Sequence, residues 1–422
     1  MKQRLTPLRF QTNHVAKVLV TVFALSLIAA GFLCETPENI ASGLWKIVNS
    51  PSILITDYFA VASMGAAFVN AGLVTLISIA LSLFIKTPYS GSFISIMFLM
   101  SGFALFGKNP LNILPFFVGV WLYARMKGHP MARYTSAALF STTLAPIVSK
   151  IALTAKLPLL SRFSLAAGTG ILIGFMIVPL AEHAFSTHMG FTLFNYGFTG
   201  GLIALVAASV VKALGMNIET SSIWQTGQPA FAVGYLLLML CILGIAGLYL
   251  CGFTFRTFVR MMRHSGRAPT DFVMTDGIGA TMINMSAVGL IGAAYIFLIG
   301  GDFNGPVIGA IFTAAGFGAA GEHPKNVIPV MAGVYLGSIL MVADTTSPGL
   351  QLAALFGSAL APIAGQFGWF YGVLAGFLHS AVVLAVGAPC GGYNLYNNGF
   401  SAGLVALVMV STIQGFSKKR IS

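Results

Sequence analysis

The chain has 422 residues, of which 57% are hydrophobic and only 8% are charged. Soluble globular proteins are about a quarter charged, and no polar stretch here exceeds a short loop, so the composition excludes a soluble domain. A long series of apolar segments separated by short polar turns predicts an all-α polytopic membrane protein. The net charge of +12 is typical of cytoplasmic anchors that follow the positive-inside rule, and we expect no nucleic-acid partner.

The hydropathy pattern predicts seven apolar segments in each half of the chain. In the first half they cover residues 15–34, 58–85, 91–106, 111–126, 134–149, 164–181 and 190–213. In the second half they cover residues 229–252, 274–299, 305–320, 325–343, 350–365, 367–388 and 398–416. The first segment has no clear cleavage site and is read as a retained helix. Several segments have only about 16 residues, whereas about 20 are needed to cross a bilayer, so we expect broken or re-entrant helices among them.

A duplicated stretch organises the whole chain. Residues 107–123 return at 321–337, and glycine, two prolines and an asparagine keep their places without a gap. These are residue types fixed by backbone geometry rather than by packing volume. The match extends over most of the chain, and it predicts a first membrane repeat at 1–213, a linker at 214–228 and a second repeat at 229–422.

Loop charges predict that the two repeats have inverted topology. The loop after the first segment is acidic, whereas the loop after its counterpart carries four arginines between residues 256 and 267. Arg125, Lys127 and Arg133 follow the fourth segment, whereas only Asp344 follows its counterpart. Equivalent loops therefore belong on opposite sides of the membrane. The basic ends of the chain place both termini in the cytoplasm, namely Lys2 with Arg4 and residues 418–420.

One loop leaves the number of crossings open. Lys150, Lys156 and Arg162 fit the cytoplasmic side only if the fifth segment is re-entrant. The sequence therefore predicts 10–14 membrane segments. Inverted repeats with broken helices are the construction of many secondary transporters, whose sites lie near the membrane midplane where the repeats meet.

The best candidates for a solute site are the two breaks at 107–112 and 321–326. We expect them to meet near the midplane and to hold a solute through backbone groups and side chains of Asn109, Asn112, His323 and Asn326. Lys108 and Glu322 occupy equivalent places and are predicted to pair across the interface as a coupling or charge pair. Glu322 and His323 could instead carry a coupling proton, or the charges could belong to a hydrated interfacial loop. The alternative is two ordinary turns at the membrane surface.

A second candidate set consists of asparagines inside or at the mouth of apolar helices. Its members are Asn70, Asn284, Asn195 and Asn397, each followed by small residues. Helix packing explains the small residues, whereas the asparagines need an internal partner or a solute. Residues 393–398 add tyrosines and asparagines that we expect to form a polar mouth for a small neutral molecule.

The remaining polar residues give weaker hypotheses. Asp57 and Asp276 are predicted to cap helices, and His379 to be a satisfied core histidine. Glu182, His183 and His188 match no metal-binding motif, so no metal site is expected. The four cysteines are expected to be structural thiols. No nucleotide-binding motif is present, and we expect no cofactor.

The duplicated stretch, residues 66–73 and residues 396–404 resemble a bacterial and archaeal family of polytopic membrane proteins. That family is defined only by a duplicated domain of unknown function, and the resemblance covers almost the entire chain. It implies a multi-pass protein of the prokaryotic inner membrane. The chain is also faintly similar to urea transporters, which have two inverted halves with broken helices; it lacks the threonine–tryptophan–proline run of that family.

These observations together predict a transporter or channel for a small polar solute rather than an enzyme. Its partners would be the solute, the lipid bilayer and a coupling ion, either proton or sodium, with the coupling and a homo-oligomeric state left open. The alternatives are a membrane-embedded enzyme that acts on a lipid-like substrate through Glu322 and His323 or through residues 182–188, and a non-transporting scaffold.

Overall fold

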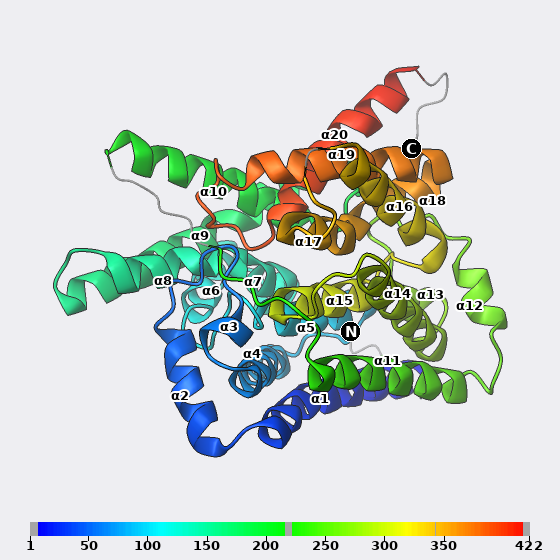
Figure 1. Cartoon of the computed structure of the whole chain (residues 1–422), viewed down its shortest axis with the longest axis horizontal. Coiled ribbons are helices and arrows are strands. Elements are labelled where there is room, and N and C mark those ends of the chain that lie inside the picture. The colour runs from blue at the N-terminus through cyan, green and yellow to red at the C-terminus, as the bar shows by residue number, and fades with distance from the viewer. Residues whose placement is uncertain (1–6, 216–221, 342, 417–422) are drawn as a thin grey trace.

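The computed structural model describes residues 7–215, 222–341 and 343–416, and its regular elements there are helices (Figure 1). Within these residues, ten helical segments are long and apolar enough to cross a membrane, five in each half of the chain. The predicted polytopic helical class is confirmed. Lys2, Arg4, linker residues 216–221 and residues 418–420 lie outside the described residues.

The first half of the chain contains α1 to α10. The elements are α1 (Pro7–Cys34), α2 (Pro37–Val48), α3 (Tyr58–Val61), α4 (Met64–Phe84), α5 (Gly91–Phe103), α6 (Leu114–Met126), the 3₁₀ helix η1 (Met131–Tyr134), α7 (Thr135–Ser141), η2 (Thr142–Leu144), α8 (Ala145–Thr154), α9 (Leu159–His188) and α10 (Asn195–Ala213).

The second half repeats most of this order. Its elements are α11 (Ala230–Leu250), α12 (Arg256–Met261), α13 (Phe272–Thr275), α14 (Ile278–Leu298), α15 (Gly305–Phe317), α16 (Pro324–Leu340), α17 (Pro348–Phe356), η3 (Gly357–Leu360), α18 (Ala361–Phe367), α19 (Trp369–Val386) and α20 (Asn397–Phe416). The pairings recur as well: α1 packs on α4 as α11 packs on α14, and α6 packs on α9 as α16 packs on α19.

Three short apolar helices, α5, α6 and α15, correspond to predicted short segments. Each has 13 residues, and at about 1.5 Å per residue it is about 20 Å long, less than the bilayer core of about 30 Å. Residues 131–154, which contain the predicted fifth segment, instead form a unit of spanning length. The 3₁₀ turn η2 at Thr142–Leu144 divides them, as expected for a broken helix, and the re-entrant path of this segment stays a prediction.

Side-chain caps fix the start of the two central helices. The Ser90 hydroxyl accepts a hydrogen bond from the backbone N–H of Phe93, and the Asn304 side chain accepts one from Val307. These residues satisfy backbone donors that a helix N-terminus leaves free. The two caps occupy equivalent positions of the repeats, so the duplicated sequence starts α5 and α15 in the same way.

Helices α5 and α15 run antiparallel at the centre of the molecule (Figure 1). A Cβ atom added to Gly102, late in α5, would clash with the carbonyl of Gly309, early in α15. Ser95, early in α5, donates a hydrogen bond of 2.8 Å to the carbonyl of Gly316, late in α15. Small residues permit this close approach. Both helices are buried along almost their whole length.

The contact between α5 and α15 obeys an approximate two-fold symmetry. Ser95 and Gly309 are equivalent positions of the duplication, and so are Gly102 and Gly316. The contact Gly102–Gly309 therefore joins the same two repeat positions as the contact Ser95–Gly316. In the second contact, each repeat supplies the position that the other repeat supplies in the first. A contact that exchanges its two sides in this way requires a two-fold axis perpendicular to the helices.

We expect Gly309→Ala to destabilise the protein by about 1–3 kcal/mol, because the added methyl group must push apart two backbones. Gly234→Ala in α11 is the matched control, since no atom lies within 4 Å of its added Cβ. Thermal unfolding in detergent, followed by circular dichroism, measures both. Equal unfolding temperatures for the two variants would contradict the close helix contact.

Candidate functional site

The first break lies between α5 and α6 and is held by asparagine side chains. Asn112 accepts a hydrogen bond of 2.9 Å from the backbone N–H of Asn109 and donates to the carbonyl of Gly107 and to the Ser149 hydroxyl. The Asn109 side chain accepts from the N–H groups of Leu111 and Asn112. Both asparagines are buried. Their amides replace the helical hydrogen bonds that the break removes.

The second break, between α15 and α16, repeats this arrangement. Asn326 accepts a hydrogen bond of 2.8 Å from the backbone N–H of His323 and donates one of 2.9 Å to the carbonyl of Gly321. The backbone N–H of Glu322 donates to Phe317, as that of Lys108 does to Phe103 in the first repeat. The predicted equivalence of the two breaks therefore extends to individual hydrogen bonds.

Asn70 and Asn284 reach each break from the neighbouring long helix. The Asn70 side chain, on α4, donates to the carbonyls of Ala104 and Lys108, at 2.7 and 2.8 Å. Asn284 on α14 donates in the same way to the carbonyls of Gly318 and Glu322, both at 2.7 Å. The side-chain oxygens of both asparagines are buried and have no partner. Of these two side chains, it is the oxygens that remain available to a solute.

We expect Asn70→Leu to lower the free energy of unfolding by about 2 kcal/mol or more, because two buried carbonyls lose their donor. Asn49→Leu is the control, since Asn49 also donates to a carbonyl, that of Trp45 at 2.9 Å, but is exposed. Its change should stay within about 0.5 kcal/mol. Denaturant unfolding in detergent compares the two, and a neutral Asn70→Leu would refute the supporting role.

Asn195 and Asn397 begin α10 and α20, and in the described part of the chain no hydrogen bond joins either side chain to a break. Asn195 binds the His188 ring at 2.9 Å and donates to the carbonyl of Ala181. Asn397 is buried, and its side-chain oxygen has no partner. Their proposed role in solute binding stays a prediction.

Residues 393–398, which are predicted to form a polar mouth, are buried and bind the first repeat. Asn394 accepts a hydrogen bond of 2.6 Å from the Thr143 hydroxyl and donates to the carbonyl of Gly197. The backbone N–H of Leu395 donates to the carbonyl of Thr143. Thr143 therefore holds the second repeat onto the first, a role that sequence analysis missed because nothing in its local pattern marks it.

Lys108 is fully buried and is held by the second repeat. Its ammonium group contacts the Tyr396 hydroxyl and the Met100 sulfur, and lies 4.7 Å from the centre of the Tyr396 ring. Glu322 is also fully buried; one carboxyl oxygen accepts a hydrogen bond of 2.9 Å from Ser358. The other oxygen has no partner.

The predicted pair between Lys108 and Glu322 is absent from the ion pairs of the described residues, and the two breaks do not meet. Each break follows the C-terminal end of its own helix, and α5 and α15 are antiparallel. The breaks therefore lie at opposite ends of a helix pair about 20 Å long. Sequence equivalence indicated that the breaks are related, but not at which depth each one lies.

Aromatic side chains of both repeats surround a small central cavity instead. It is lined by Leu99, Phe103, Phe194, Phe356, Leu395, Tyr396, Asn398 and Gly399. The Phe103 ring lies 4.3 Å from the Tyr396 ring and stacks on Phe356 at 5.2 Å, both measured between ring centres. The cavity volume is about 10 Å³, which is about the space that one water needs.

Two aspartates cap the central helices reciprocally. Asp57 of the first repeat accepts a hydrogen bond of 3.2 Å from the N–H of Gly305, the first residue of α15. Asp271 of the second repeat accepts from the N–H of Gly91, the first residue of α5, at 2.9 and 3.0 Å. Burial raises the pKa of Asp57 to about 6, although its hydrogen bonds to backbone N–H groups, including that of Gln225, lower it.

The predicted cap by Asp57 is confirmed, since it also accepts from the N–H of Phe59 at the start of α3. The predicted cap by Asp276 is wrong, because Gly277 precedes α14 and Asp276 forms ion pairs instead. Sequence reasoning missed Asp271. Asp271 is the residue equivalent to Asp57, 214 positions further along the chain. Asp276 was chosen instead because, like Asp57, it precedes a long apolar segment.

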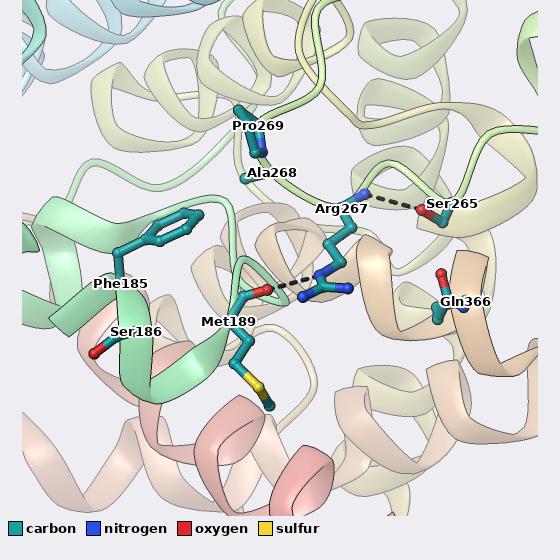
Figure 2. Close-up of a pocket in the computed structure, with 8 residues that line it drawn as sticks. All are labelled: Phe185, Ser186, Met189, Ser265, Arg267, Ala268, Pro269 and Gln366. Carbon is teal, nitrogen blue, oxygen red and sulfur yellow. Dashed lines mark hydrogen bonds between the residues drawn. The ribbon is translucent and has the colours of Figure 1, made fainter. Parts of the chain in front are cut away.

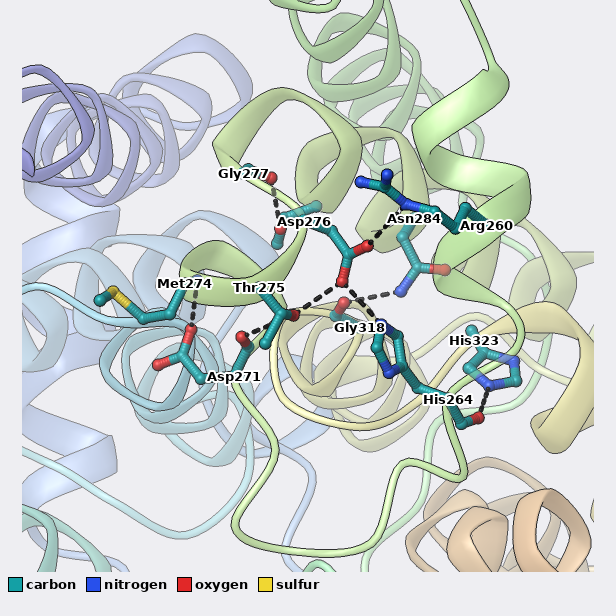
Figure 3. A network of polar contacts seen from close by, with 11 residues as sticks. Arg260, His264, Asp271, Met274, Thr275, Asp276, Gly277, Asn284, Gly318 and His323 are labelled. Carbon is teal, nitrogen blue, oxygen red and sulfur yellow. Dashed lines mark hydrogen bonds and ion pairs between the residues drawn. The ribbon is translucent and has the colours of Figure 1, made fainter. Parts of the chain in front are cut away.

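A polar network connects the second break to the loop before α14 (Figure 3). The His323 ring binds the backbone carbonyl of His264 at 3.0 Å through Nε2, and its Nδ1 has no partner. The His264 ring lies 3.0 Å from Asp276, which also lies 3.9 Å from Arg260. His264 and Arg260 are exposed, whereas His323 is buried.

The remaining candidates are placed as follows. His379 binds Asn398 at 3.2 Å and Ser401 at 3.0 Å, which confirms a satisfied core histidine. Glu182 and His183 are exposed on α9. Among the described residues, no three histidine, cysteine or acidic side chains gather into a metal site.

A larger surface cavity of about 700 Å³ lies beside the end of α9 and contains none of the predicted site residues (Figure 2). Arg267 lies in it, donating a hydrogen bond of 2.7 Å to the carbonyl of Met189 and lying over the Phe191 ring. These contacts join the loop before α13 to the end of α9.

Comparison with known families matches both halves of the chain. A family model described as "Protein of unknown function (DUF1576)" matches residues 36–213 and again residues 251–415. This confirms the predicted resemblance to a family with a duplicated domain, whereas the likeness to urea transporters stays a prediction. No curated protein and no solved structure matches the chain.

Proposed function

We propose that this chain, which belongs to the DUF1576 family of proteins of unknown function, is a membrane transporter or channel for a small polar solute. The observation that supports the proposal is the pair of broken helices at the centre of a bundle of ten candidate spans. Backbone breaks at membrane depth are tolerated where they line a solute path or are covered by protein.

Charge burial supports a functional role for the breaks. Lys108 and Glu322 are both completely buried, and neither has an opposite charge as a partner among the described ion pairs. Charged side chains within a bilayer cost about 2.5–3.5 kcal/mol each even on the mildest scale, and they usually mark solute or ion pathways. A scaffold would gain nothing from keeping them at equivalent positions of both repeats.

The repeats are proposed to have inverted topology, with both termini in the cytoplasm of a prokaryotic cell. Two observations support this orientation. The equivalent helices α5 and α15 are antiparallel, and the loops after α1 and α11 carry opposite charge. If α5 and α15 lie along the membrane normal, the two-fold axis lies in the membrane plane, which is the arrangement of inverted-repeat transporters.

The central aromatic cavity is the proposed midpoint of the path. Both repeats contribute to its wall, and its side chains lie between the two breaks. Its volume of about 10 Å³ leaves room for about one water, so the proposal treats this arrangement as an occluded conformation. Transport would require the repeats to move apart at the Phe103–Tyr396 contact on one side and at the Phe194–Phe317 contact on the other.

Transport is a better explanation than catalysis on a lipid-like substrate. Glu322 and His323 are buried, and the loop at Gly266 packs tightly against Gly321 and covers the break. A lipid-like substrate would need a lateral entrance to these side chains. Glu182 and His183, the other acid–base set, are exposed, and within the described ranges they form no cluster with a third ligand.

Proteoliposomes provide the test. Stopped-flow osmotic assays with a panel of small polar solutes (polyols, amides, amino acids and sugars) should show protein-dependent permeability for at least one of them. Asn112→Leu is a poor test variant, because it also removes the hydrogen bonds that hold the break. Leu99 lines the cavity and is buried, so Leu99→Phe should fill the path.

We expect Leu99→Phe to reduce this permeability by about tenfold or more while the variant still folds. Leu83→Phe, on the exposed side of α4, is the matched control and should keep the wild-type rate. Folding of both is checked by thermal unfolding in detergent. Equal permeability of the two variants, or no flux of any solute by the wild type, would count against the proposed path.

A further inference from the structure

The two breaks differ in the partner available to their buried charged residue. Lys108 and Glu322 are equivalent, and so are Tyr396 and Phe194, which precede the equivalent asparagines Asn397 and Asn195. The ammonium group of Lys108, at the first break, donates a hydrogen bond to the hydroxyl of Tyr396 in the second repeat. At the second break, the equivalent of that tyrosine is a phenylalanine, which has no hydroxyl. Glu322 therefore lacks the partner that the two-fold symmetry would supply.

The surroundings of Glu322 favour an uncharged carboxyl group. Glu322 is 0% exposed, and Oε1 accepts a single hydrogen bond from the neutral hydroxyl of Ser358. Oε2 is buried without any partner. The ion pairs found among the described residues do not include Glu322. A buried carboxylate with so few donors is strongly unfavourable, and binding a proton removes the charge without requiring a counter-ion.

The charged and titratable groups around the break leave Glu322 without a counter-ion. His323 is its neighbour and Lys325 is exposed on the same break. Arg260 of α12 and His264 each pair with Asp276, which precedes α14. Arg267, next to the Gly266 that packs on the break, binds the carbonyl of Met189. The other groups on packed elements are Asp271, which caps α5, and His379 behind Gly357, which is bound to Asn398 and Ser401.

His323 provides a route between Glu322 and one surface. Its Nε2 faces the backbone carbonyl of His264, which can only accept, so Nε2 carries the hydrogen and the unpartnered Nδ1 of the neutral ring is a free base. His264 itself is exposed beside Asp276. The imidazole therefore joins the second break, where Glu322 lies next to it in the chain, to the carbonyl of exposed His264 (Figure 3).

We infer that Glu322 is the proton-binding group of this protein and that His323 relays the proton to the surface of the His264 loop. The coupling of this proton to solute movement rests on the proposed transport function. The step is a proton transfer that needs one bridging water, because neither Oε2 of Glu322 nor Nδ1 of His323 has a hydrogen-bond partner. The carboxyl O–H bond breaks, the water passes a proton to Nδ1, and the imidazolium ring releases its Nε2 proton toward the surface. A carboxylate remains at Glu322 until a proton returns.

Infrared spectroscopy of the purified protein tests proton binding without a known solute. We expect the carbonyl stretch of a protonated carboxyl group at neutral pH, and we expect Glu322→Gln to remove this band. Glutamine keeps the shape of the neutral acid and its bond to Ser358, so the variant should fold. Glu182→Gln, at an exposed position, is the control and should leave the band unchanged. An unchanged band in Glu322→Gln would overturn the inference.

The pH dependence of stability gives a second readout. In the unfolded chain a glutamate is ionised above pH about 4.3, whereas folded Glu322 keeps its proton, so the folded state binds one proton more. Stability from this group therefore falls as pH rises, with the unfolding equilibrium constant growing about tenfold per pH unit. Glu322→Gln should lack this component. Parallel pH profiles for wild type and variant would contradict proton binding.

Hydrogen–deuterium exchange of the same infrared band tests the relay. His323→Leu should slow the exchange by about tenfold or more, because the base that follows Glu322 in the chain is lost. His183→Leu, at an exposed site on α9, is the control and should not alter the rate. Equal exchange rates in the two variants would reject His323 as the relay.

The experiments can reject the proton-coupling hypothesis and the transport hypothesis independently of each other. If the band belongs to Glu322 but no solute of the panel crosses proteoliposomes, the transport function is wrong and proton binding stands. If a solute crosses and an imposed pH gradient does not change its rate, transport stands and proton coupling is overturned.

Discussion

Backbone contact between α5 and α15 is the constraint on which the rest of the structure depends. At Gly102 and Gly309 the two helices approach so closely that neither position can accept a side chain. The contact is antiparallel and repeats under an approximate two-fold axis, so it places the end of each helix beside the start of the other. The position of the breaks, the aspartate caps and the aromatic cavity all follow from that arrangement.

Breaking a helix inside an apolar bundle creates backbone groups that need partners, and this protein supplies them from amide side chains. Asn112 and Asn326 bind within their own breaks, whereas Asn70 and Asn284 reach in from α4 and α14. Each amide serves several backbone groups at once. The same side chains that look like solute ligands in a sequence are thus required first for the fold.

Sequence reasoning predicted the duplication, the two breaks and the equivalence of their asparagines, because glycine, proline and asparagine are set by local backbone geometry. It could not predict that the breaks lie at opposite ends of α5 and α15, since an alignment of repeats carries no information on depth. Long-range partners were also missed. Nothing near Thr143 indicates that it binds the opposite repeat, because that contact exists only after the halves are packed. Asp271 can be found only through its equivalence with Asp57, and its partner on the other repeat only in the structure.

The reciprocal aspartates have a consequence for how the protein is made. The first residue of α5, Gly91, donates its N–H to Asp271, which lies 180 positions further along the chain. During synthesis, the first half therefore enters the bilayer before Asp271 has been translated. The N–H of Gly91 at the start of α5 then lacks its carboxylate acceptor. Neither half contains everything its own central helix requires, so assembly is completed only when the second half arrives.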